Sequence, residues 1–214
     1  MSDSGFIYLT SDFFENEEKF MNEILKSSYV KQYQKNAVIT RQDEASDTIY
    51  ILLEGRIEAN YIAEDGQKKI FSIFEPRIMF GESNLAGFPN LLNFVCLTPV
   101  KVAAIRKQDI YNWDKQMLFT IIHILLCKLK TVGYQLTNQI FDDVEDRIEK
   151  LLFESAKLYS KANSEKLTVE VPITHQVIAD IVGTSRVRVT QTITKMTREG
   201  KITVSGKKII LHTQ

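Results

Sequence analysis

The sequence predicts an α+β protein in three parts: an antiparallel, cupin-like β-roll or barrel, then a long helix, then a winged helix-turn-helix. Short runs of β-branched and aromatic residues, separated by turn residues such as Asp65-Gly66, predict the roll between about residues 29 and 107. An apolar stripe at three- and four-residue spacing predicts the helix. Helical periodicity followed by two short strands predicts the last part. The expected boundaries are 1–108, 109–141 and 142–214.

The distribution of charge indicates a partner for the C-terminal part. The whole chain has 27 basic and 27 acidic residues, so its net charge indicates none. From residue 171 onward, however, the basic residues Arg186, Arg188, Lys195, Arg198, Lys201, Lys207 and Lys208 face only two acids, Asp180 and Glu199. A neutral front and a basic end are typical of a chain that binds nucleic acid at that end.

Several classes of protein are not expected. Cys96 and Cys127 form neither a disulfide framework nor a metal-ligand spacing, which is typical of the reducing cytoplasm. His123, His175 and His212 are isolated from any catalytic constellation, so we expect no enzyme. The N-terminus shows no secretory signal. The apolar cluster at 117–129 is interrupted by polar residues and is expected to be too short for a bilayer, so we expect no membrane partner.

The long helix is predicted to run from about Lys107 to Phe141 with two apolar faces. One stripe consists of Ile121, Leu125, Leu129, Val132, Leu136 and Ile140. A second face is formed by Phe119, Ile122, Ile124 and Leu126. One face for the roll and one for a twin helix predicts a homodimer with a coiled-coil seam along the first stripe. The alternative is that the stripe only packs on the roll.

A helix-turn-helix is predicted between residues 174 and 200. Thr174 caps a helix to Val182, Gly183 supplies the left-handed turn, and Thr184 caps a second helix to about Glu199. The outer face of the second helix carries Arg186, Val187, Arg188, Thr190, Gln191 and Lys195, with no acid before Glu199. The alternative, an ordinary solvated face, would carry mixed charge. The basic face and the following strand pair therefore predict binding to double-stranded DNA.

The order of these parts resembles the Crp/Fnr superfamily of transcription regulators. The resemblance covers about residues 25–212 and rests on Ile51-Leu52-Leu53-Glu54-Gly55, on Phe80-Gly81-Glu82, on the junction from Phe141 to Ile148 and on the winged helix-turn-helix. It implies an effector-responsive, cytoplasmic homodimer that binds inverted-repeat sites and contacts RNA polymerase. The family's base-contacting positions fall on Arg186, Val187 and Gln191. Phosphate contacts fall on Thr174, His175, Ser185, Arg188, Thr190, Lys195, Lys207 and Lys208, and the effector pocket falls on Gly81, Glu82, Leu91, Leu92, Leu129, Val132 and Gly133.

Departures from the family's pattern bear on the effector. Members that bind cyclic AMP have an arginine after Gly-Glu, whereas the loop at 83–95 here has no basic residue. Val132 and Gly133 replace a Thr-Ser pair that contacts the adenine. Cyclic AMP is therefore not expected, because a buried phosphate would lack a countercharge. Two cysteines exclude the family's iron–sulfur branch, which needs about four.

What remains is a small organic effector in a pocket with an apolar wall. The general look of the sensing part is similar to the family's regulators of haloaromatic respiration. Two alternatives stay open at this point. One is a haem-based gas sensor that uses His123, and the other is a ligand-binding signalling module that has lost DNA binding.

Overall fold

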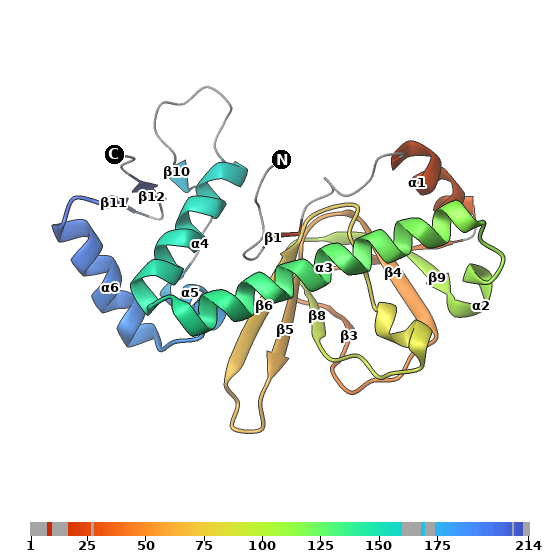
Figure 1. Cartoon of the computed structure of the whole chain (residues 1–214), viewed down its shortest axis with the longest axis horizontal. Coiled ribbons are helices and arrows are strands. Elements are labelled where there is room, and N and C mark those ends of the chain that lie inside the picture. The colour runs from red at the N-terminus through yellow and green to blue at the C-terminus, as the bar shows by residue number, and fades with distance from the viewer. Residues whose placement is uncertain are drawn as a thin grey trace. The chain divides into compact units, whose positions relative to one another are not determined.

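The computed structural model describes residues 8–9, 17–26, 28–159, 168–169, 174–206 and 208–211. It divides into two units: one comprises Leu9–Lys130, and the other comprises Thr131–Gln214 with Met1–Tyr8. Each unit is described by itself, with the elements as they are labelled in Figure 1. Lys207, a predicted phosphate contact, lies outside the described residues.

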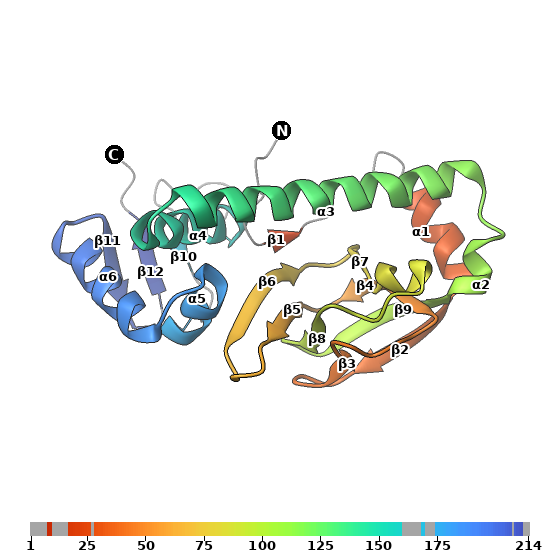
Figure 2. The ribbon, with the colours of Figure 1, turned by 60° about the horizontal axis from the view of Figure 1, so that its bottom comes forward.

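The first unit is an antiparallel roll of two sheets. One sheet has the order β1-β6-β5-β8-β3 and the other β2-β9-β4-β7 (Figure 2). The strands are β1 (Tyr8–Leu9), β2 (Tyr29–Tyr33), β3 (Val38–Thr40), β4 (Thr48–Glu54), β5 (Ile57–Ile62), β6 (Lys68–Phe74), β7 (Met79–Phe80), β8 (Asn93–Cys96) and β9 (Val100–Arg106). The predicted antiparallel roll is confirmed. So is the Asp65-Gly66 hairpin, where Gly66 has a φ of 84° between the paired strands β5 and β6.

Strand β4 separates two hydrophobic cores because its side chains alternate between the faces of its sheet. Tyr50 and Leu52 point into the roll, where Tyr50 stacks on Phe80 with ring centroids 5.2 Å apart. Ile49 and Ile51 point outward into a second core. Helix α1 (Glu17–Lys26) and the long helix α3 contribute to this second core, which also contains Ile24, Ile110, Met117, Ile121 and Ile124. The long helix is thus attached to the roll by its own apolar side chains.

The long helix begins later than the sequence predicts. Lys107–Ile110 forms a separate short helix, α2, and the continuous helix α3 spans Lys115–Phe141. Between them the chain turns, and the Asp114 carboxylate accepts a hydrogen bond from Met117 N at 2.8 Å. This side-chain cap starts a new helix, because it satisfies one of the N–H groups that have no partner within a helix's first turn.

Helix α3 also corrects the expectation about membranes. It is the one helix among the described residues that is long and apolar enough to cross a membrane, by length and composition only. Its apolar part is not too short, because the helix has 27 residues and about 20 suffice to span a bilayer. A single helix of this kind is weak evidence for a membrane protein. Part of its apolar surface, at Met117, Ile121 and Ile124, is already buried against the roll.

The second unit contains the predicted winged helix-turn-helix. Its elements are α4 (Val144–Tyr159), β10 (Thr168–Val169), α5 (His175–Val182), α6 (Arg186–Arg198), β11 (Ile202–Ser205) and β12 (Lys208–Leu211), and the strands form an antiparallel sheet in the order β10-β12-β11. Its buried apolar residues include Ile148, Leu151, Ile178, Ile181, Val182, Val189, Ile193 and Met196. The spacing of the last six is the one from which the sequence predicts two crossing helices.

Candidate nucleic-acid interface

The turn between α5 and α6 is built as the sequence predicts, except at one cap. Thr174 Oγ1 accepts a hydrogen bond from Val177 N at the start of α5, and Gly183 ends the helix with a φ of 72°. The cap of α6 is Ser185, whose Oγ accepts from Arg188 N at 3.2 Å, and not the expected Thr184. Thr184 N donates to Ala179 O, so this residue still closes α5. The turn is therefore one residue longer than expected.

Both capping hydroxyl groups remain able to contact DNA. In each cap the oxygen serves as an acceptor, which leaves the hydroxyl proton free to be donated to a phosphate oxygen. Thr174 and Ser185 also stand at helix N-termini, where backbone N–H groups and the helix dipole favour an anion. Their predicted role as phosphate contacts is compatible with their role as caps.

The first three turns of α6 expose a face without acidic residues. Arg186, Val187, Arg188 and Gln191 are exposed on it, and Val187 is 67% exposed. Leaving an apolar side chain of this size in water gains nothing for the fold itself. The composition of this face is compatible with the predicted contact surface, which stays a prediction.

Two of the predicted phosphate contacts touch each other. His175 Nδ1 lies 2.8 Å from Thr190 Oγ1, and Thr190 Oγ1 also donates to Arg186 O at 3.0 Å. Because the hydroxyl proton goes to Arg186 O, the Thr190 oxygen is free to accept from His175 Nδ1. This contact orients the imidazole ring between the first turn of α5 and the face of α6.

Lys195 is not a free side chain on this face. Its Nζ lies 2.6 Å from Glu145 Oε2, and Lys201 Nζ lies 3.0 Å from Glu145 Oε1. The hydrogen bond from Lys195, which has the larger effect, and the one from Lys201 both lower the pKa of the Glu145 carboxyl below its ordinary value. Glu145 was missed in the sequence because it stands on α4, 50 positions before Lys195. The side chain of Lys208 and all of Lys207 lie outside what the structure describes.

The effector pocket that the sequence predicts is a second candidate site, and its first two residues, Gly81 and Glu82, belong to the roll. Gly81 has a φ of 79° and starts the short 3-10 helix η1 (Glu82–Ala86). Lys128 of α3 donates to Glu82 Oε1 and to Met79 O, both at 2.6 Å, and its Nζ lies 5.2 Å from the centroid of the Phe74 ring. The loop at 83–95 contains no basic residue, but the helix supplies a cation. Nothing in the local sequence pairs Lys128 with Glu82, because the two are 46 positions apart.

The other predicted pocket residues are not gathered around this ion pair. Leu92 packs partly buried against the core of the roll, whereas Leu91 is 68% exposed. Leu129 and Val132 are exposed on α3, and a Cβ added at Gly133 would meet nothing within 4 Å. Their assignment to the pocket stays a prediction.

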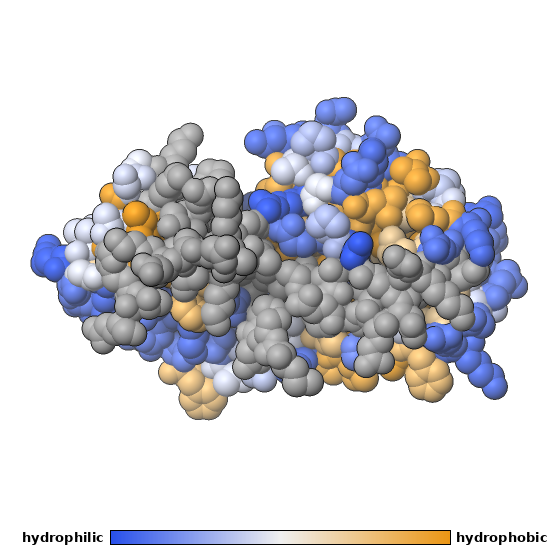
Figure 3. All heavy atoms as spheres, turned by 90° about the horizontal axis from the view of Figure 1, so that it is seen from above, coloured by the Kyte–Doolittle hydropathy of each residue, from blue (hydrophilic) through white to orange (hydrophobic). Residues whose placement is uncertain are grey.

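The predicted dimer seam is an exposed apolar face, with one change of residue. Leu125, Leu129, Val132, Leu136 and Ile140 are all exposed. Ile121, which the sequence stripe includes, is instead 5% exposed and packs in the core of the roll, and Ile122 and Leu118 extend the exposed face. Figure 3 shows apolar side chains along its lower edge. This edge is the side of the molecule that faces the viewer in Figure 1, where α3 lies in front. An apolar helix face of this kind is normally buried against another element or another chain.

Comparison with known proteins yields two domain matches. A model of the cyclic nucleotide-binding domain matches residues 30–116, and a model of the Crp-like helix-turn-helix domain matches residues 146–213. The chain is 24% identical over 183 residues to a CRP-like cAMP-activated global transcriptional regulator of Mycobacterium tuberculosis, covering 84% of this chain and 82% of the relative. It is also 24% identical to the cAMP-activated global transcriptional regulator CRP of Pasteurella multocida, covering 88% of this chain and 92% of the relative.

Solved structures show the same fold. The c-di-GMP responsive global regulator CLP of Xanthomonas campestris superposes with a TM-score of 0.82 at 19% identity and covers 92% of this chain and 100% of its own. The regulator CprK complexed with OCPA superposes with a TM-score of 0.71 at 20% identity, covering 92% of each chain.

Among the residues that the structure describes, no group of three or more His, Cys, Asp or Glu side chains could hold a metal ion.

The cap at Ser185 gives a direct test of this local geometry. We expect Ser185→Ala to destabilise the C-terminal unit by about 0.5–2 kcal/mol, because the Arg188 N–H loses its acceptor. Thr184→Ala is the matched control, since the Thr184 side chain caps nothing in α6. Chemical denaturation followed by circular dichroism measures both variants. A larger loss for Thr184→Ala than for Ser185→Ala would restore the original assignment of the cap.

Proposed function

Because the chain belongs to the Crp/Fnr family of transcription regulators, we propose that it acts as a homodimer that binds inverted-repeat DNA in response to a small organic effector. Members of this family are regulators and not enzymes. A regulator of this kind works in the cytoplasm, where it contacts chromosomal DNA and RNA polymerase. The observation that carries the proposal is the exposed, acid-free face of α6 between Arg186 and Gln191, on a helix-turn-helix whose two helices are both capped.

The chemistry of this face favours sites rich in A·T pairs. Arg186 is able to hold a guanine through its O6 and N7 atoms. Val187 offers only apolar contact, which suits the methyl group of thymine, and Gln191 pairs bidentately with adenine. Among the neighbouring residues Arg188 is suited to a phosphate, which positions the protein without specifying sequence, and Thr190 can donate to a phosphate only if it releases Arg186 O.

A second copy of the chain is the partner that best fits the exposed apolar face of α3. Leu125, Leu129, Val132, Leu136 and Ile140 follow one another at spacings of four, three, four and four, which is the pattern of a coiled-coil seam. A lipid bilayer would require apolar side chains all round the helix. The opposite face of α3 instead carries Lys128 in an ion pair with Glu82.

The polar groups beside Gly81 favour an effector with a hydroxyl group. Lys128 has three N–H donors, of which Glu82 and Met79 O use two. A hydroxyl group of the effector would accept a hydrogen bond from the third N–H of Lys128 and donate its own proton to the Glu82 carboxylate. The phosphate of a cyclic nucleotide would instead meet the Glu82 carboxylate, with a single ammonium group to balance two negative charges. We therefore propose a phenol or a similar small hydroxyl compound rather than cyclic AMP.

Gln191→Ala tests base readout. We expect the substitution to weaken the free energy of DNA binding by about 1–3 kcal/mol at one A·T pair in each half-site and to relax the base preference there, because the bidentate contact is lost. Selection of bound duplexes from a random pool, with wild type and variant in parallel, measures this. Identical sequence preferences in the two proteins would mean that Gln191 touches only the backbone.

Leu125 and Leu129, replaced together by glutamate, test the seam. We expect monomers that have lost specific DNA binding, since like charges would face each other across two apolar layers. Sedimentation without detergent gives the oligomeric state. The proposal fails if the wild type is monomeric at micromolar concentration while it still binds DNA specifically, or if it sediments only with membranes.

Lys128→Met tests the effector site. Calorimetry with a panel of phenols should detect binding to the wild type, and the variant should lose it because the ammonium donor is gone while the chain length at 128 is kept. Cyclic AMP should not bind to the wild type with a Kd at or below the order of tens of micromolar. Tight binding of cyclic AMP would contradict the assignment, and so would phenol binding that survives in the variant.

A further inference from the structure

The carboxylate of Glu145 lies where two cations of the DNA-binding unit meet. Oε2 pairs with Lys195 at 2.6 Å and Oε1 with Lys201 at 3.0 Å, while Glu199 lies farther from the same two ammonium groups, at 3.8 Å from Lys195 and 3.5 Å from Lys201. Lys195 comes from α6 and Lys201 from the turn that follows it, whereas Glu145 is in the first turn of α4. Two oxygens that each accept from a separate ammonium group are also what a DNA phosphate offers.

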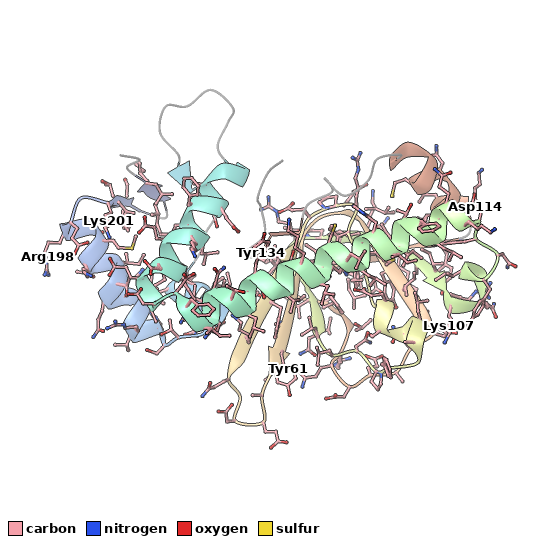
Figure 4. The ribbon with its side chains drawn as sticks, in the orientation of Figure 1. Tyr61, Lys107, Asp114, Tyr134, Arg198 and Lys201 are labelled. Atoms are coloured by element: carbon pink, nitrogen blue, oxygen red, sulfur yellow. The ribbon has the colours of Figure 1, made fainter. Side chains whose placement is uncertain are left out.

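Both lysines stand at positions from which DNA is within reach. Lys195 follows Gln191 by four residues, so the two side chains share one face of α6. Lys201 lies where the chain leaves α6 for the wing, beyond Arg198 (Figure 4). Their side chains are 56% and 42% exposed, so they are accessible to a ligand in spite of the ion pair.

We propose that Glu145 acts as an internal competitor of DNA phosphates: it holds Lys195 and Lys201 back and so limits the electrostatic part of DNA binding. This inference rests on the proposed DNA-binding function. It adds that the salt dependence and the non-specific affinity of the domain are set by an acid on α4, while sequence discrimination stays with the base-contacting residues of α6.

The expected size of the effect follows from counterion release. Each lysine that neutralises a phosphate of duplex DNA steepens the dependence of log K on log salt concentration by about 0.9. Two lysines withheld in each chain therefore remove up to about 1.8 from the slope per chain. The lysine ends of these pairs are exposed, which weakens the pairs, so we expect the main effect of Glu145 in binding and only a small one in stability.

The first experiment compares Glu145→Gln with Glu149→Gln in the full-length chain. Binding to the selected duplex and to a random duplex is titrated across a series of salt concentrations. We expect Glu145→Gln to bind both duplexes more tightly at low salt, with a slope steeper by about 1–2 per chain and unchanged base preferences. Glu149→Gln removes the same charge one turn later on α4, where the carboxylate lies 4.0 Å from Lys201, and should leave the slope unchanged.

The second experiment replaces Lys195 and Lys201 by methionine, with and without Glu145→Gln. In the otherwise wild-type chain the slope should not change, because Glu145 holds both ammonium groups away from the phosphates. In the Glu145→Gln background the two replacements should return both the affinity and the salt slope to their wild-type values. A slope reduced by about 2 per chain in the otherwise wild-type chain would show that the lysines already contact phosphates and would overturn the proposal.

Other outcomes separate this inference from the proposed function. Weaker binding by Glu145→Gln at an unchanged slope would mean that Glu145 only orients α6, which also overturns the proposal. Arg188→Met serves as the reference for a true phosphate contact and should lower the slope by about 1 per chain. A wild type that binds no duplex at any salt concentration would overturn the proposed function, and this inference with it.

Discussion

The rest of the structure depends on the two apolar faces of helix α3. Met117, Ile121 and Ile124 on one face complete a hydrophobic core with the outer side of strand β4. The opposite face is apolar as well, but none of the residues that the structure describes buries Leu125 or Leu129. Burying such a face against an identical helix is the least demanding way to remove it from water, because one sequence then supplies both partners. The proposed dimer thus follows from how the roll holds its helix.

The proposed effector site and the proposed dimer seam share this helix. Lys128, on the face toward the roll, is bonded to Glu82 and Met79, and Leu129, the next residue, is exposed on the seam. Under the proposed function, a ligand that competes for the ammonium group would change the restraint on the helix directly beside the proposed seam. Coupling of this kind needs no long pathway, because one rigid element takes part in both sites.

The sequence predicts those features that depend on local patterns. Periodicity located the roll, the long helix and the two helices of the DNA-binding unit, and Gly183 marked the turn. What it missed depends on contacts between distant residues or on small shifts of phase. The pairs Lys128–Glu82 and Lys195–Glu145 join positions 46 and 50 residues apart. Ile121 and Ile122 differ by one position, or about 100° around the helix, so the stripe alone did not show which of them faces the roll.

The central claim is that two chains hold one duplex, and native mass spectrometry of the protein with its selected duplex tests it most directly. The account predicts a complex of two chains with one DNA molecule. It also predicts that cutting the duplex to a single half-site abolishes specific binding, because both recognition helices must enter successive major grooves about 34 Å apart. A complex of one chain per duplex that keeps full specific affinity would contradict it.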